Sequence, residues 1–76
     1  MKELVEYVAK ELVDDPSQVH VRVVRNSRAL VVLELRVAPD DMGRIIGRNG
    51  RVANAIRSLL QVMGERRGKR VTLDIV

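Results

Sequence analysis

Gly47 and Gly50 enclose two polar residues, Arg48 and Asn49, at the point where one predicted helix ends and another begins. Glycine has no Cβ atom, so it can adopt positive φ angles and let another backbone approach closely. A helix that begins directly after such a loop presents unbonded N–H groups and the positive end of its dipole. Both features suit a phosphate group. The two glycines therefore predict a helix–loop–helix unit whose loop binds an anion.

Positive charge is concentrated in the segment that contains this loop. Residues 42–70 contain eight Lys and Arg residues and one acid, Glu65, so their net charge is +7, against +4 for the whole chain. Arg44, Arg48 and Arg51 surround the glycines. Segregated positive charge is typical of proteins that bind polyanions. A solvated face of a basic protein is the alternative interpretation.

The composition limits the other classes of function. The 76 residues include no Cys, Phe or Trp, one aromatic residue, Tyr7, and one histidine, His20. A single domain spanning residues 1–76 must therefore build a small core from aliphatic side chains. The absence of cysteine excludes disulfides and thiolate metal sites, and no nucleophile–base pair is evident. The sequence predicts a protein that is not an enzyme and has no metal, cofactor or small-molecule substrate.

The chain also lacks targeting signals. Its first residues contain no apolar core of a signal peptide, and no apolar stretch approaches the length of a membrane span. We therefore expect a cytoplasmic protein without a membrane segment.

Hydrophobic periodicity divides the chain into three helices and three strands. The helices are predicted over residues 2–13, 39–46 and 52–63. Asp40 or Asp41 is expected to cap the second helix, and Gly64 to end the third. The strands are predicted over residues 19–23, 29–38 and 71–75, the first two forming an antiparallel hairpin.

The order is helix–strand–strand–helix–helix–strand, and each element offers one apolar face. The simplest packing is an α+β fold, a two-layer α/β sandwich in which three helices cover one face of a three-stranded mixed sheet.

A known family shares this arrangement. The run Ile46-Gly47-Arg48-Asn49-Gly50, followed by Ala53 and Ile56, resembles the GxxG loop of the KH domain, in its type II arrangement. The segments 38–47 and 55–60 resemble the small bacterial KhpA (YlqC) family. The resemblance implies a groove for about four nucleotides of single-stranded RNA, clamped by the GxxG loop. It also implies an RNA chaperone or post-transcriptional regulator with a KhpB (Jag-type) RNA-binding partner.

Each predicted RNA-binding residue has a distinct expected role. The glycines admit the phosphates, Arg48 neutralises one of them, and Arg44 and Arg51 flank the site from the two helices. Arg57 lies with Asn54 on the polar side of the last helix, and the sequence leaves open whether it faces the groove. Ile45 or Ile46, with Val52, would form an apolar floor, although each is also a candidate core residue. The predicted site consists of Arg44, Ile45, Ile46, Gly47, Arg48, Asn49, Gly50, Arg51, Val52, Asn54 and Arg57.

The lack of aromatic residues sets the expected strength of binding. Aromatic stacking contributes ~1–3 kcal/mol per base, and no such platform is present here. We therefore expect weak binding by one copy, low sequence specificity and strong salt dependence. The residues do not decide between RNA and single-stranded DNA, nor whether Arg66, Arg67, Lys69 and Arg70 make contact.

Association with a protein is also expected. Val24, Leu30 and Val32 would project from the sheet face opposite the helices, and an exposed aliphatic cluster favours association. We expect a homodimer or a complex with a KhpB (Jag-type) protein. A protein-interaction or assembly module without nucleic-acid binding is the alternative function.

Overall fold

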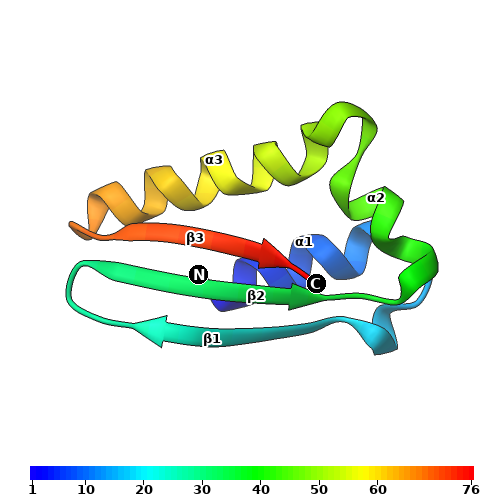
Figure 1. The fold of residues 1–76 in the computed structure, drawn as a ribbon, viewed down its shortest axis with the longest axis horizontal. Coiled ribbons are helices and arrows are strands. Elements are labelled where there is room, and N and C mark those ends of the chain that lie inside the picture. Colours follow the sequence, from blue (N-terminus) through cyan, green and yellow to red (C-terminus); the bar gives the residue numbers. More distant parts are fainter.

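A computed structural model describes all of residues 1–76 and contains three helices and three strands (Figure 1). The helices are α1 (Lys2–Leu12), α2 (Met42–Ile46) and α3 (Arg51–Arg66). The strands are β1 (His20–Asn26), β2 (Leu30–Arg36) and β3 (Arg70–Ile75). Single 3₁₀ turns η1, η2 and η3 lie at Pro16–Gln18, Pro39–Asp41 and Arg48–Gly50. The predicted order of elements is confirmed.

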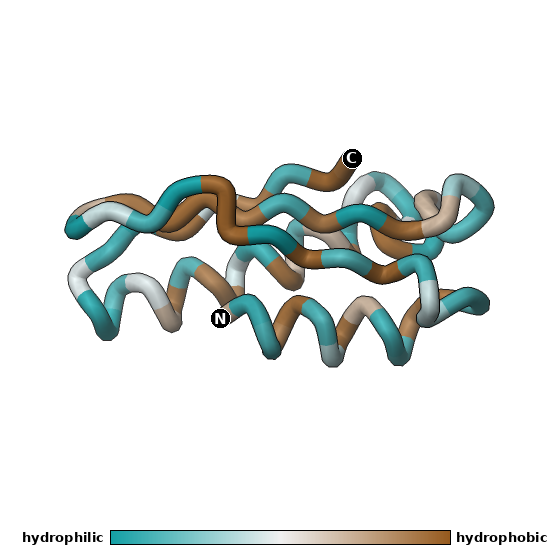
Figure 2. Tube along the Cα trace, turned by 90° about the horizontal axis from the view of Figure 1, so that it is seen from below, coloured by the Kyte–Doolittle hydropathy of each residue, from teal (hydrophilic) through white to brown (hydrophobic).

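The three strands form one mixed sheet in the order β1-β2-β3. β1 pairs antiparallel with β2, and β3 pairs parallel with β2 after the crossover through α2 and α3. Figure 2 shows the sheet as one layer and the helices as a second layer on one side of it. The predicted two-layer α+β fold is therefore confirmed, and β3 is left as an edge strand.

An aliphatic core fills the space between the two layers. The largest fully buried side chains are Val5, Leu33, Leu35, Ile45 and Leu60, which come from α1, β2, α2 and α3. Valines from all three strands complete it. None of the helices combines the length and hydrophobicity that a membrane span requires.

A β-bulge makes β1 longer than the sequence pattern suggested. The pairing register shifts between Val23 and Arg25, so Val24 is an extra residue with no partner on β2. The alternation of side chains that predicted a strand over 19–23 breaks at this bulge. The strand continues beyond it, and the ladder resumes with Arg25 opposite Val32.

Gly64 does not end α3, contrary to expectation. It is buried inside the helix, where a Cβ atom would lie 2.5 Å from the carbonyl oxygen of Lys69 and 2.7 Å from Cγ2 of Val71. The helix continues to Arg66, and Gly68, at φ +66°, makes the turn into β3. The glycine at position 64 is therefore explained by close packing of the helix against the following backbone.

Neither Asp40 nor Asp41 caps α2 through its side chain, which corrects the second capping prediction. The Asp41 carboxylate is 2% exposed and accepts hydrogen bonds from the backbone N–H groups of Asp14 and Asp15, at 3.0 and 3.1 Å. A buried carboxylate is stable when it is hydrogen-bonded in this way. Asp41 therefore ties the connection between α1 and β1 to the start of α2.

Candidate nucleic-acid interface

The loop between α2 and α3 has the backbone conformation that its glycines predicted. Gly47, Asn49 and Gly50 all have positive φ angles, at 76°, 56° and 76°. Asn is one of the few side-chain-bearing residues that tolerate this region. A Cβ atom at position 47 would also lie 2.5 Å from Cγ2 of Val52. Gly47 is therefore required both by its dihedral angle and by the lack of space.

The loop is open to solvent, because Arg48 and Asn49 are exposed and the two glycines are partly exposed. No side chain caps the N-terminus of η3 or of α3; the backbone N–H groups of Gly50 and Arg51 donate to the carbonyl oxygens of Gly47 and Arg48 within the turn. The first N–H groups of a helix have no partner within the helix. The loop and the start of α3, which is a 16-residue helix, can therefore receive an anion from outside.

The three arginines around the loop differ in their freedom. Arg48 and Arg51 are exposed and form no ion pair. Arg44 instead bridges two acids, with Nη2 3.0 Å from Oδ2 of Asp14 and Nε 3.8 Å from Oδ1 of Asp41. Arg44 thus joins α2 to the end of α1, and the cations available to a phosphate at the loop are Arg48 and Arg51.

The predicted apolar floor is only partly available. Ile45 is fully buried in the core, so it cannot contact a ligand in this conformation. Ile46 is 40% exposed, and Val52 is partly exposed directly beneath Gly47. Ile46 and Val52 are therefore the two aliphatic residues that can lie under a bound strand at the loop.

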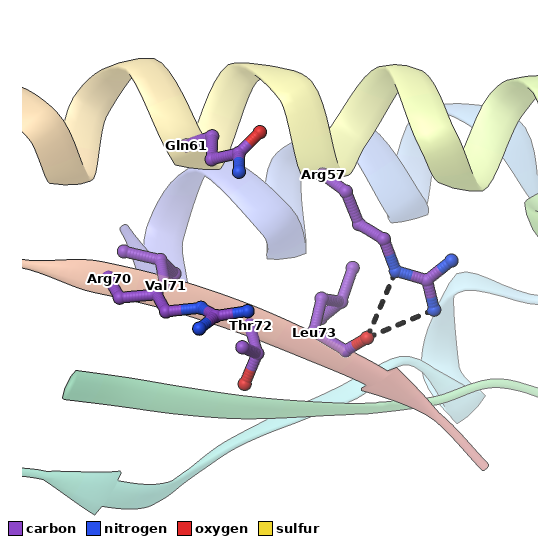
Figure 3. A pocket seen from close by; sticks show the side chains of 6 residues that line it. All are labelled: Arg57, Gln61, Arg70, Val71, Thr72 and Leu73. Carbon is purple, nitrogen blue, oxygen red and sulfur yellow. Dashed lines mark hydrogen bonds between the residues drawn. The ribbon is translucent and has the colours of Figure 1, made fainter.

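Asn54 and Arg57 extend the site along α3. A Cβ at Gly50 would lie 3.6 Å from Nδ2 of Asn54, which places this exposed amide beside the loop. One turn further, Arg57 donates from Nε and Nη2 to the carbonyl oxygen of Leu73, at 3.2 and 3.0 Å (Figure 3). Because β3 is an edge strand, this guanidinium partly covers the open edge of the sheet.

A groove runs between α3 and β3, beyond the loop. Arg57 and Gln61 of α3 line one side of the groove, as Figure 3 shows. The strand supplies the other side with Arg70, Val71, Thr72 and Leu73. Guanidinium, amide and hydroxyl groups can all bond to phosphates or base edges, whereas the side chains of Val71 and Leu73 are buried in the core. The groove therefore has the chemistry expected for a single-stranded nucleic acid.

The comparison with known proteins agrees with this geometry. The family model described as "KhpA/KhpB, KH domain" matches residues 2–75. The chain belongs to the KhpA/KhpB family of KH-domain proteins. It is 46% identical to the RNA-binding protein KhpA of Clostridium perfringens over the full length of both chains. It is 45% identical to the KhpA of Aquifex aeolicus, over all of this chain and 95% of that one. No solved structure gave a significant match.

The fold of this KhpA/KhpB-family chain places Asn54 beside the loop and Arg57 against β3, but it removes Ile45 into the core and pairs Arg44 with acids. Sequence reasoning missed Gln61 and Thr72, and it left Arg70 in a loop. Gln61 follows Arg57 by four residues and Thr72 follows Arg70 by two, so helical and strand periodicity carried a signal for both. Only the packing of α3 on β3 shows that these residues share one groove.

Proposed function

We propose that this chain binds single-stranded RNA without catalysing a reaction. The loop Gly47–Gly50 would hold the sugar-phosphate backbone, and the groove between α3 and β3 would hold the following nucleotides. The observation that carries this proposal is the start of α3, which no side chain caps, behind two partly exposed positive-φ glycines, with Arg48 and Arg51 free of ion pairs. The relatives named RNA-binding protein KhpA support the choice of ligand.

Low sequence specificity follows from the kind of contact available. The site offers aliphatic side chains at the loop and flexible polar groups in the groove, and the only aromatic residue, Tyr7, lies on α1 outside it. Backbone contacts carry no sequence information directly. A weak, salt-dependent and sequence-tolerant RNA binder of this kind suits an RNA chaperone or post-transcriptional regulator in the bacterial cytoplasm.

A charge reversal at the loop tests the proposal. Arg48→Glu keeps both glycines and changes an exposed side chain, so the fold should be retained. A hydrogen bond to a charged group contributes ~1.5–3 kcal/mol, so we expect a loss of affinity of about tenfold or more for a uridine tetranucleotide. Lys10→Glu makes the same charge change on the exposed face of α1 and should have little effect.

The result distinguishes the alternatives. Unchanged RNA affinity in Arg48→Glu would mean that the loop is not the clamp. No RNA binding by the unaltered chain would favour a protein-interaction or assembly module. Equal affinity for the matching thymidine tetranucleotide would favour a general binder of single strands over an RNA binder, because only RNA offers the 2′-hydroxyl group.

Association with a second protein is also part of the proposal. Leu59 and Val62 on α3 are 53% and 56% exposed. Of the predicted cluster on the sheet, Val24 is 50% exposed, whereas Leu30 and Val32 are partly buried. A homodimer, or a complex with a KhpB (Jag-type) protein, would cover such residues and raise the effective affinity for RNA. Light scattering at micromolar concentration should detect the homodimer, and Leu59→Lys should abolish it. A monomer at every concentration would exclude the homodimer.

A further inference from the structure

The face of the sheet turned away from the helices is strongly basic. Side chains on this face alternate with the buried ones and come from all three strands. They include four arginines, Arg22, Arg25, Arg36 and Arg70, against two acids, Glu34 and Asp74. Only Arg22 has an ionic partner among them, with Nη2 3.2 Å from Oε1 of Glu34. Three guanidinium groups are therefore free on a surface that covers no core.

The β-bulge in β1 determines that one of these cations, Arg25, lies on the outer face. Arg25 has the same parity along the chain as Val21 and Val23, which face the helices, so a regular strand would turn it inward. The extra residue Val24 shifts the alternation of side chains by one residue. Arg25 therefore pairs with Val32, a residue of the outer face, and lies on that face. Bulges commonly redirect a side chain at a functional edge.

Two aliphatic side chains lie between the cations. Leu30 pairs across the ladder with Arg70, and Val32 lies between Arg25 and Thr72. Both are partly exposed, so they form a small apolar surface with an arginine on each side. Cross-strand neighbours on one face are close enough to contact the same ligand. A second copy of this chain would bring like charges together here, whereas a polyanion matches both the charge and the apolar surface.

This surface is continuous with the groove between α3 and β3. Arg70 and Thr72 line the groove and also belong to the outer face, because β3 is the edge strand. In Figure 3 the Arg70 side chain extends along β3 toward Thr72. A nucleic-acid strand that leaves the groove at this edge therefore reaches the outer face directly. No acidic side chain lies on the outer face between Arg70 or Thr72 and Val32.

From this juxtaposition we infer that the outer face of the sheet, formed by Arg25, Leu30, Val32, Arg70 and Thr72, is a second RNA-binding surface. The inference rests on the proposed function, because it extends the path of the same RNA strand beyond the groove. Arg25 and Arg70 bind phosphates on either side of the aliphatic pair, and bases lie against Leu30 and Val32. RNA longer than the approximately four nucleotides held by a GxxG groove binds more tightly as a result.

The test compares a uridine tetranucleotide with a uridine dodecanucleotide by fluorescence anisotropy. Arg25→Glu should weaken binding of the dodecanucleotide by about tenfold and leave that of the tetranucleotide within about twofold. Arg25→Lys should restore the dodecanucleotide affinity, and the matched change Lys10→Glu should alter neither. In amide NMR spectra, the signals of Arg25 and Val32, which lie outside the groove, should shift with the longer RNA only. A thermal melt checks that each variant is folded.

The outcomes separate this inference from the proposed function. The inference is overturned if Arg25→Glu binds the dodecanucleotide as tightly as the unaltered protein or as Lys10→Glu does. If the Arg25 and Val32 signals shift with a polyglutamate peptide of equal length and do not shift with the dodecanucleotide, the inference is also overturned, in favour of an acidic protein segment. In both cases the effect of Arg48→Glu on the tetranucleotide still decides the proposed function independently.

Discussion

Gly47 lies directly against Val52, the second residue of α3, so that a Cβ atom at position 47 would be 2.5 Å from the Val52 Cγ2 atom. Gly50 has a similar positive φ angle, but the nearest atom to a Cβ there is Nδ2 of Asn54, at 3.6 Å. The two glycines of one loop are thus required for different reasons: space and dihedral angle at position 47, dihedral angle alone at position 50.

Gly47→Ala should therefore destabilise the protein more than Gly50→Ala. A residue with a side chain in the left-handed region costs about 1–2 kcal/mol, which applies to both variants. Overpacking against Val52 adds about 1–3 kcal/mol at position 47 only. Urea denaturation of the two variants measures the difference. Equal losses of unfolding free energy would mean that Val52 moves aside without cost.

Gly64→Ala and Gly43→Ala should change stability in opposite directions. Alanine favours a helix by about 1 kcal/mol over glycine, and a Cβ at Gly43 meets nothing within 4 Å, so Gly43→Ala should stabilise. At Gly64 the Cβ would lie 2.5 Å from the backbone oxygen of Lys69, so the variant should lose about 1–3 kcal/mol. Urea midpoints check the signs, and stabilisation by Gly64→Ala would contradict the packing described here.

Asp41→Asn should destabilise the fold, although it changes the shape of the side chain little. Both oxygens of Asp41 accept backbone N–H groups, from Asp14 and Asp15, and an amide offers one acceptor in place of two. A buried donor left without a partner costs about 1–3 kcal/mol. Asp40→Asn, at the exposed neighbouring residue, serves as the control and should change the unfolding free energy little. Similar losses in both variants would indicate a general charge effect.

Arg44→Gln and Arg48→Gln should separate stability from RNA binding. Arg44 pairs with Asp14 and Asp41, so its loss should reduce the unfolding free energy by about 0.5–1 kcal/mol and affect RNA affinity weakly. Arg48 has no partner in the protein, so its loss should leave stability unchanged and weaken RNA binding. One phosphate contact fewer should also lower the slope of log affinity against log salt by about 0.7. Urea denaturation and a salt titration of RNA binding measure both quantities. If Arg44→Gln weakened RNA binding and Arg48→Gln did not, the RNA contact would belong to Arg44.

The sequence by itself determined the order of elements, the fold class and the loop at Gly47–Gly50. Periodicity of two and of 3.6 residues is a local property of the chain, and so is the ability of a glycine to adopt a positive φ. The same local information failed at Gly64, Asp41 and Val24. Each of these is explained by a partner distant in sequence or on another strand: Lys69 and Val71 for Gly64, the amides of Asp14 and Asp15 for Asp41, and the β2 register for Val24.

Only the tertiary structure decided which arginines near the loop are free of ion pairs. Arg44 and Arg48 are four residues apart and look equivalent in sequence. Arg44 is nevertheless paired with the distant Asp14 and with the nearby Asp41, and Arg48 is free. Arg57, Gln61, Arg70 and Thr72 share a groove because α3 packs along β3, and Arg25 reaches the outer face because of the bulge. Charge neutralisation and groove formation depend on contacts between distant segments, and a linear pattern does not contain those contacts.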